Sequence, residues 1–248
     1  MRDRDPFAEF DGLVHELEQG LERTRAPGRA AEAPRPRRSW KARLARWSFR
    51  ALLACAALVL PFYLLVGSSV LFYRVYGVPT WPALLAGVLL TVLVLLVYSA
   101  WITKRVSGKV KMPGFLPKAL LAVVGAYCLY ALIYISSMNV KGGIGDTYHS
   151  LHPLLRLATS TFILVDSDLV VTDMERQPED YARMRLPRYE QSLHFEQADG
   201  YAHAVDLRTL GRSGWRNFFM QAYFRAMGFR TVRHVGTADH LHVSLPLP

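Results

Sequence analysis

Two short stretches near the carboxyl end of the chain concentrate side chains that bind metals. One is SLHFEQADGYAHAVD, residues 192–206, and the other is HVGTADHLH, residues 234–242. A catalytic zinc site needs three ligands drawn from histidine and carboxylate side chains, an open position for water, and a carboxylate that takes the water's proton. Together the two stretches contain all of these groups.

The same residues resemble the motifs of the VanY-like group of zinc D-Ala-D-Ala carboxypeptidases and related peptidoglycan endopeptidases. That family carries Ser-x-His-x-x-Gly-x-Ala-x-Asp, followed by carboxylate-x-x-His before or on the last strand. Here Ser192, His194 and Asp206 match the first motif, and Asp239 and His242 match the second. The resemblance implies that His194, Asp206 and His242 bind Zn2+ and that Asp239 is the general base.

The first motif departs from the family pattern in its spacing. The resemblance covers about residues 150–248, but His194 precedes Asp206 by twelve positions, where the family has seven. Either five residues are inserted in a loop between the two ligands, or the first ligand is His203 or Asp199. We favour the insertion, because a loop can lengthen without moving its ends.

Two further residues are candidates for substrate binding beside Ser192. The segment VVTDMER resembles the family's strand and the arginine-bearing turn after it, which implies that Arg176 binds the substrate carbonyl or carboxylate. A planar guanidinium suits both groups. The competing interpretation is a surface ion pair of Arg176 with Glu175 or Glu179. If the tail is a strand, His240 shares a face with His242 and lies near the metal without necessarily binding it.

Other conspicuous residues have structural interpretations. His149 and His152 are expected in a loop or at a helix start. Five aromatic residues at helical spacing are expected in a helix core rather than in a ligand site: Trp215, Phe218, Phe219, Tyr223 and Phe224.

Upstream, three charge-free apolar segments are long enough to cross a bilayer, which takes about 20 helical residues. They are residues 51–73, 81–103 and 119–138, within an 88-residue stretch (51–138) that has no acidic residue. We therefore expect three transmembrane helices, because buried helices of a soluble core would not all be apolar on every side.

Basic residues set the expected orientation of these spans. The residues before the first span and the loop between the second and third are rich in Lys and Arg, whereas the other two flanks carry one basic residue each, Arg74 and Lys141. Short basic loops stay in the cytoplasm. The pattern predicts a multi-pass protein of the bacterial cytoplasmic (inner) membrane, with a cytoplasmic amino terminus and an extracytoplasmic, periplasmic carboxy-terminal domain.

The ends of the chain differ in character. Residues 1–50 are expected to form a cytoplasmic amphipathic helix, from Phe7 onward, and a basic Pro/Arg-rich tether. Residues 139–248 are expected to form a small α+β domain with an antiparallel sheet, in the order helix, strand, strand, helix, strand. The predicted fold class is thus a three-helix membrane anchor with a zinc-peptidase-like domain.

The charge distribution argues against nucleic-acid binding. The formal net charge is +10, but residues 1–138 carry all of it, and residues 139–248 have 12 basic and 12 acidic residues. Basic residues therefore flank apolar segments instead of forming a globular basic site. The expected partners are the lipid bilayer and peptidoglycan stem peptides, and the sequence leaves the oligomeric state open.

The function that these patterns predict is a membrane-anchored zinc peptidase that cuts peptidoglycan stem peptides outside the membrane. A peptidase-like module that binds or senses such peptides without cutting them is the alternative, because the spacing from His194 to Asp206 is irregular. A transporter is disfavoured, because the spans hold no ionisable residue of the kind that marks a pathway.

Overall fold

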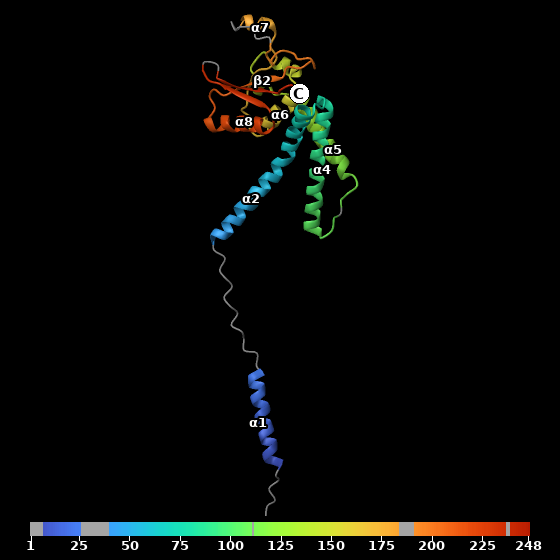
Figure 1. The fold of residues 1–248 in the computed structure, drawn as a ribbon, viewed down its shortest axis with the longest axis vertical. Helices are drawn as coiled ribbons and strands as arrows, with labels where there is room; N and C mark the ends of the chain where they lie inside the picture. The colour runs from blue at the N-terminus through green and yellow to red at the C-terminus, as the bar shows by residue number, and fades with distance from the viewer. Residues whose placement is uncertain (1–6, 26–39, 111, 184–190, 237–238) are drawn as a thin grey trace, which may run out of the picture. The chain divides into compact units, whose positions relative to one another are not determined.

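The computed structural model describes residues 7–25, 40–110, 112–183, 191–236 and 239–248 (Figure 1). Its contacts divide the chain into two compact units, residues 1–53 and residues 54–248. The second unit contains most of the membrane-type helices as well as the domain with the candidate site. The predicted tether between residues 26 and 38 lies outside the described residues.

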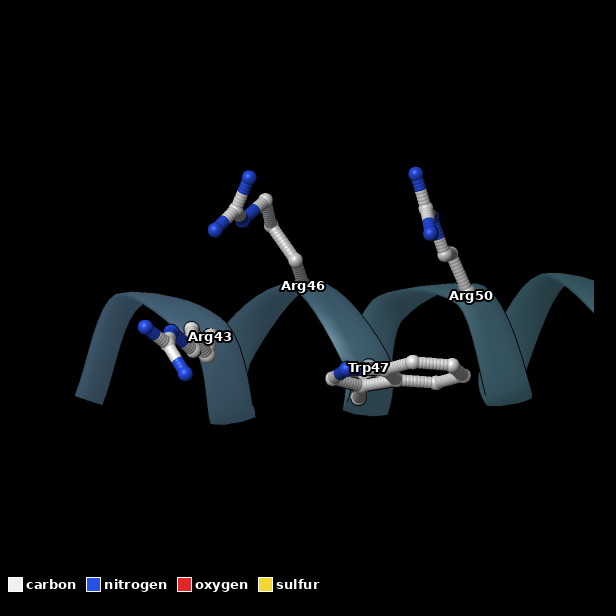
Figure 2. Close-up of a pocket in the computed structure, with 4 residues that line it drawn as sticks. All are labelled: Arg43, Arg46, Trp47 and Arg50. Atoms are coloured by element: carbon white, nitrogen blue, oxygen red, sulfur yellow. The ribbon is translucent and has the colours of Figure 1, made fainter. Parts of the chain in front are cut away.

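The amino-terminal unit contains the predicted amphipathic helix, α1 (Phe7–Arg25), and the start of α2 (Trp40–Tyr63). Figure 2 shows the basic start of α2, with Arg43, Arg46, Trp47 and Arg50 on successive turns. The Arg50 guanidinium lies 6.0 Å from the centroid of the Trp47 ring. Arginine and tryptophan at the end of an apolar helix are typical of a membrane–water interface.

Within the described residues, three helices are long and apolar enough to cross a membrane: Arg43–Tyr76, Thr80–Ser107 and Leu116–Ile133. The first is built from α2, a π-helical turn at Leu64–Ser68 and α3 (Ser69–Tyr76), and the others are α4 (Thr80–Ser107) and α5 (Leu116–Ile133). The second extends beyond the predicted 81–103 at both ends. The third ends at Ile133 instead of residue 138, because Tyr134 adopts an extended conformation and Ser137–Asn139 form a 3-10 turn.

Helices α3 and α4 approach closely at a glycine. A Cβ atom added at Gly87 of α4 would lie 2.1 Å from Ser69 Oγ and 2.7 Å from the Leu65 carbonyl oxygen. Small residues at such positions let the backbones of membrane helices pack together.

The described part of the carboxy-terminal domain contains four strands and the helices between them. After two 3-10 segments (Ser137–Asn139 and Gly145–Ser150), the helices are α6 (Pro153–Ile163), α7 (Pro178–Arg183) and α8 (Gly214–Ala226); the strands are β1 (Val171–Asp173), β2 (Ala204–Arg208), β3 (Arg230–His234) and β4 (His240–Ser244). Strand β3 and helix α7 were not predicted. The exposure of nearly every β3 residue left no alternation in the sequence to reveal it.

The strands form one antiparallel sheet in the order β1-β2-β4-β3. Val205 and Leu207 of β2 and Leu241 and Val243 of β4 are buried in the core that α6 and α8 share. Because side chains alternate along a strand, Asp206 points to the opposite face of the sheet. In Figure 1, α6 and α8 lie on the side of β2 toward α4 and α5, and α7 lies on the other side.

The domain is hydrogen-bonded directly to the carboxyl end of the third apolar helix, α5. Three domain side chains satisfy carbonyl groups that the end of α5 leaves without helical partners. Tyr148 Oη donates to the Ala131 oxygen at 2.6 Å, Ser160 Oγ to the same oxygen at 3.3 Å, and Arg156 Nη1 to the Leu132 oxygen at 2.6 Å. The spans from Ala54 onward and the domain therefore belong to one compact unit.

One expectation about the core is wrong. Phe224 is buried and Tyr223 is half-buried, but Trp215, Phe218 and Phe219 are 65 %, 57 % and 49 % exposed. Helix α8 packs on the domain through Asn217, Met220 and Phe224. Its first two turns thus present aromatic rings outward.

Candidate metal centre

Strand pairing brings two of the predicted ligands together on the open face of the sheet. Asp206 of β2 lies directly opposite His242 of β4, and His242 Nδ1 is 2.8 Å from Asp206 Oδ1. Both side chains lie on the face away from Val205 and Leu207. A cross-strand pair in an antiparallel sheet holds its side chains close together, so the register of β2 and β4 alone sets this contact.

The third group comes from the loop that leads to β2. His194 Nε2 lies 3.3 Å from His242 Nδ1 and 3.4 Å from Asp206 Oδ1. His194 is only 2 % exposed. Ser192 Oγ accepts a hydrogen bond from the backbone N–H of His194 at 3.3 Å, so the Ser-x-His pattern fixes the loop locally. The loop between His194 and Asp206 accommodates their twelve-position spacing, as the insertion hypothesis requires.

The tautomer of His194 suits a metal ligand. Its Nδ1 donates to the Met174 carbonyl oxygen, an atom that only accepts, so Nε2 of the neutral ring carries a lone pair toward Asp206 and His242. Three electron-pair donors that converge in this way need a proton or a cation between them. Ligand atoms 2.0–2.1 Å from a tetrahedral zinc ion lie about 3.3 Å apart, and the three atoms here are separated by 2.8, 3.3 and 3.4 Å. The donor set fits Zn2+.

Arg176 holds the other side of the Asp206 carboxylate. Its Nη2 donates to Asp206 Oδ2 at 2.9 Å, and its Nε donates to Asp173 Oδ2 at 2.6 Å. Arg176 therefore pairs with Asp173 and Asp206, and no ion pair to Glu175 or Glu179 is among the described contacts. Burial alone would raise the pKa of Asp206, but with no metal bound and the rings of His194 and His242 protonated, their N–H groups donate to the carboxylate, outweigh burial and hold that pKa well below its usual range.

His240 lies beside the cluster, as expected for a neighbour on the same face. Its Nε2 is 3.6 Å from Asp206 Oδ2, and its ring stacks on that of His234, with centroids 4.7 Å apart. His234 occupies the paired position on β3. The metal-competent triad therefore lies at the edge of a patch of imidazoles.

Asp239, the predicted base, has other partners. It immediately precedes β4, but its carboxylate accepts hydrogen bonds from Thr209 Oγ1 and from Arg233 Nη2, the latter at 3.0 Å. These bonds, from Arg233 above all, lower its pKa. The described contacts do not bring Asp239 to His242, so its role as a base remains a prediction.

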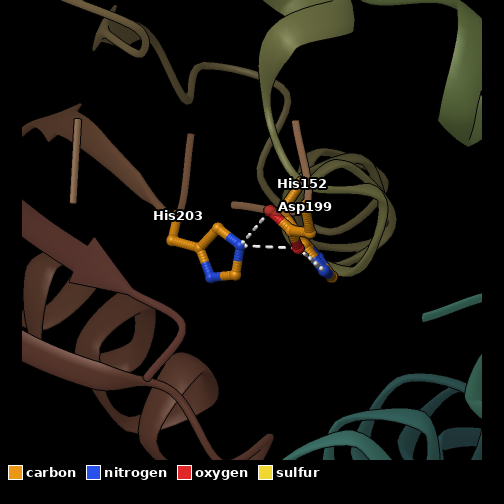
Figure 3. A group of neighbouring side chains, drawn as sticks. All are labelled: His152, Asp199 and His203. Atoms are coloured by element: carbon orange, nitrogen blue, oxygen red, sulfur yellow. Dashed lines mark hydrogen bonds and ion pairs between the residues drawn. The ribbon is translucent and has the colours of Figure 1, made fainter. Parts of the chain in front are cut away.

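The alternative first ligands belong to a second cluster. His203 Nε2 lies 2.9 and 3.1 Å from the two oxygens of Asp199, and His152 Nε2 lies 3.6 Å from Asp199 Oδ2 (Figure 3). His152 is the N-cap of α6, as the helix-start interpretation suggested. The structure thus brings His194, and not His203 or Asp199, to Asp206.

The second cluster is ill-suited to a metal. His152 Nδ1 accepts a hydrogen bond from the Leu154 backbone N–H at 3.2 Å, so its Nε2 carries the proton and has no free lone pair. That nitrogen lies 2.9 Å from the hydroxyl of Thr80, the first residue of α4. Burial, with His203 and Arg156 nearby, lowers the pKa of His152 to about 2. The cluster is a hydrogen-bond network of two buried histidines and an exposed aspartate, and His152 joins it to Thr80 of the second span.

Comparison with known proteins gives no family assignment. No family model matches the chain, and neither a curated protein nor a solved structure matches it. The interpretation of the site therefore rests on its own geometry.

Proposed function

We propose that the chain is a membrane-anchored zinc metallopeptidase that hydrolyses peptidoglycan stem peptides outside the bacterial cytoplasmic membrane. The convergence of His194 Nε2, Asp206 Oδ1 and His242 Nδ1 carries the proposal. It agrees with the residues expected from the resemblance to the VanY-like carboxypeptidases and endopeptidases.

The chain's own groups have distinct roles in this proposal. His194, Asp206 and His242 would hold Zn2+, which would supply the Lewis acidity that activates water and polarises a peptide carbonyl. Arg176 presents a guanidinium beside the same carboxylate and would bind the substrate carboxylate or the developing oxyanion. Ser192 positions the His194 loop, and His240 would face the substrate. Asp239 would accept and return a proton after leaving Arg233.

The location of the site suits a substrate outside the bilayer. Helices α6 and α8 cover one face of the sheet, and α6 packs against α4 and α5, while the triad occupies the opposite face. The basic flanks of the spans favour an extracytoplasmic domain. A polymer beyond the membrane would reach this face more readily than a substrate within the lipid.

The pairing of Asp239 with Arg233 favours a second candidate function, a peptidase-like module that binds stem peptides without cutting them. A carboxylate held by Arg233 and Thr209 is a weak base for water. The two functions differ in turnover alone.

The test uses the full chain in detergent or nanodiscs, because the domain is bonded to the spans. With Zn2+ and peptidoglycan stem peptides, we expect released D-alanine or cleaved cross-links, and loss of that product with a chelator. Asp239→Asn should lower kcat by about 10²–10⁴-fold if Asp239 is the base. Binding without product would favour the module, and neither binding nor product would refute both.

A further inference from the structure

We propose that one edge of the carboxy-terminal domain inserts into the lipid leaflet on its own side of the membrane. This interfacial edge consists of five exposed apolar residues: Leu164, Val165, Trp215, Phe218 and Phe219. Val165 is 85 % exposed, and the other four are between 49 % and 65 % exposed. The inference rests on the apolar helices crossing a bilayer, and it is independent of the metal chemistry.

The five residues come from two segments that an ion pair joins. Leu164 and Val165 directly follow α6, and Trp215, Phe218 and Phe219 occupy the first turns of α8. Asp166, next to Val165, pairs with Arg216, next to Trp215, so the two segments are joined by an ion pair. Within α8, the Trp215 ring stacks on Phe218 with centroids 5.6 Å apart and meets Phe219 edge-on at 4.5 Å.

The position of Leu164 relates this edge to the depth of the membrane. Leu164 lines an apolar groove of about 450 Å³ together with residues of all three spans, including Thr91 and Leu95 of α4. A hydrocarbon core about 30 Å thick takes about 20 helical residues. Counted from Lys104 at the basic end of α4, that length reaches to about Leu84, so Thr91 and Leu95 lie within the core.

The amino-terminal half of α4 explains why the domain lies close to the hydrocarbon core of the membrane. The helix has 28 residues and is longer than the hydrocarbon core requires. Its buried residues all lie between Thr80 and Val92, where the domain and the other helices pack around it. The turn that follows α8 also contacts a span, because Arg74 Nη1 donates to the Gly228 carbonyl oxygen.

The composition of the edge fits a lipid interface better than a protein partner. Tryptophan and phenylalanine beside arginine are typical of helices that lie in the headgroup region, with the rings in the acyl boundary and the guanidinium groups toward phosphate. The surface is continuous with the groove between the spans, whose occupant in a membrane is hydrocarbon. The edge therefore continues the lipid-facing surface of the spans.

Single-cysteine labelling of the full chain in lipid nanodiscs tests this inference. Cys55→Ala and Cys128→Ala remove the native thiols, and Val165→Cys or Phe218→Cys carries an environment-sensitive fluorophore. Val232→Cys is the matched control, because Val232 is 52 % exposed and pairs with His242 on the open face. We expect lipids spin-labelled near the headgroup to quench the first two positions at least twofold, and iodide in water to quench only position 232.

Two results would overturn the inference. Equal quenching of all three positions by iodide would place the edge in water, and protection from both quenchers would mean that another protein covers it. A second measurement needs no cysteine change: the intensity of tryptophan emission that brominated lipid removes should be larger for the unmodified chain than for Trp215→Phe. The same lost intensity in those two chains would mean that lipid does not quench Trp215 and would contradict lipid contact. Neither readout depends on zinc or on catalysis.

Discussion

Arg176 donates to Oδ2 of Asp206 at 2.9 Å, while Oδ1 of the same carboxylate faces His194 and His242. One carboxylate thus joins the arginine to both histidines. The arginine fixes the carboxylate's rotation, so a change at Arg176 alters the candidate metal site without removing any of its three donors.

Replacing Arg176 by lysine should impair catalysis more than metal binding. Lysine keeps the positive charge but lacks the planar fork that contacts Asp173 and Asp206 together. We expect kcat/KM on stem peptides to fall about 10²-fold with one zinc retained, as measured by product release and by metal analysis. Unchanged turnover in Arg176→Lys would exclude a role for the guanidinium in the reaction.

Replacing His242 or His194 by alanine should abolish zinc binding. Each change leaves two of the three converging donors, too few for a catalytic zinc site. Metal analysis of the full chain, after dialysis against a weak chelator, should fall from about one zinc per chain to nearly none. His149→Ala removes an exposed imidazole outside the triad and is the control. Retention of zinc by His242→Ala would refute the assignment.

Replacing Gly87 by alanine should destabilise the helix bundle. The added methyl group would lie 2.7 Å from the Leu65 carbonyl oxygen, a backbone atom that cannot rotate away. Overpacking of this kind costs about 1–3 kcal/mol. Gly125→Ala in α5 is the matched control, because nothing lies within 4 Å of its added Cβ. Thermal unfolding in detergent should show a lower midpoint for Gly87→Ala only.

Acid should destabilise the domain through His152. Burial lowers its pKa to about 2, whereas the unfolded chain binds the proton below about pH 6.5. The unfolded state therefore gains protons first, and the free energy of unfolding falls with decreasing pH, by about 2 kcal/mol at pH 5.

His152→Asn isolates this effect, because asparagine keeps an N-cap acceptor for the Leu154 N–H and does not titrate. Denaturant unfolding between pH 7.5 and 5 should show a smaller loss of stability in His152→Asn than in the unmodified chain. Equal pH dependence of the two chains would mean that His152 is protonated in the folded domain.

The sequence by itself determined the features that depend on neighbouring residues. Charge-free apolar runs marked the three long helices, because a helix in lipid must be apolar on every side. The phenylalanine and leucine spacing marked α1 from Phe7 onward, and alternation marked β2 and β4, which carry Asp206 and His242. Such periodicity depends only on residues that are close together in the sequence.

The tertiary structure decided what depends on distant contacts. Strand register and the fold of the loop after Ser192 selected His194 over His203, and the tautomer of His152 set the second cluster apart from the first. The exposed rings of α8 were mistaken for core, because aromatic spacing alone does not show which face of a helix meets a partner. Asp239 likewise pairs with Arg233 of β3, and the sequence did not predict this strand because its exposed residues show no apolar alternation. These relationships arise from pairings across the fold, which spacing along the chain does not encode.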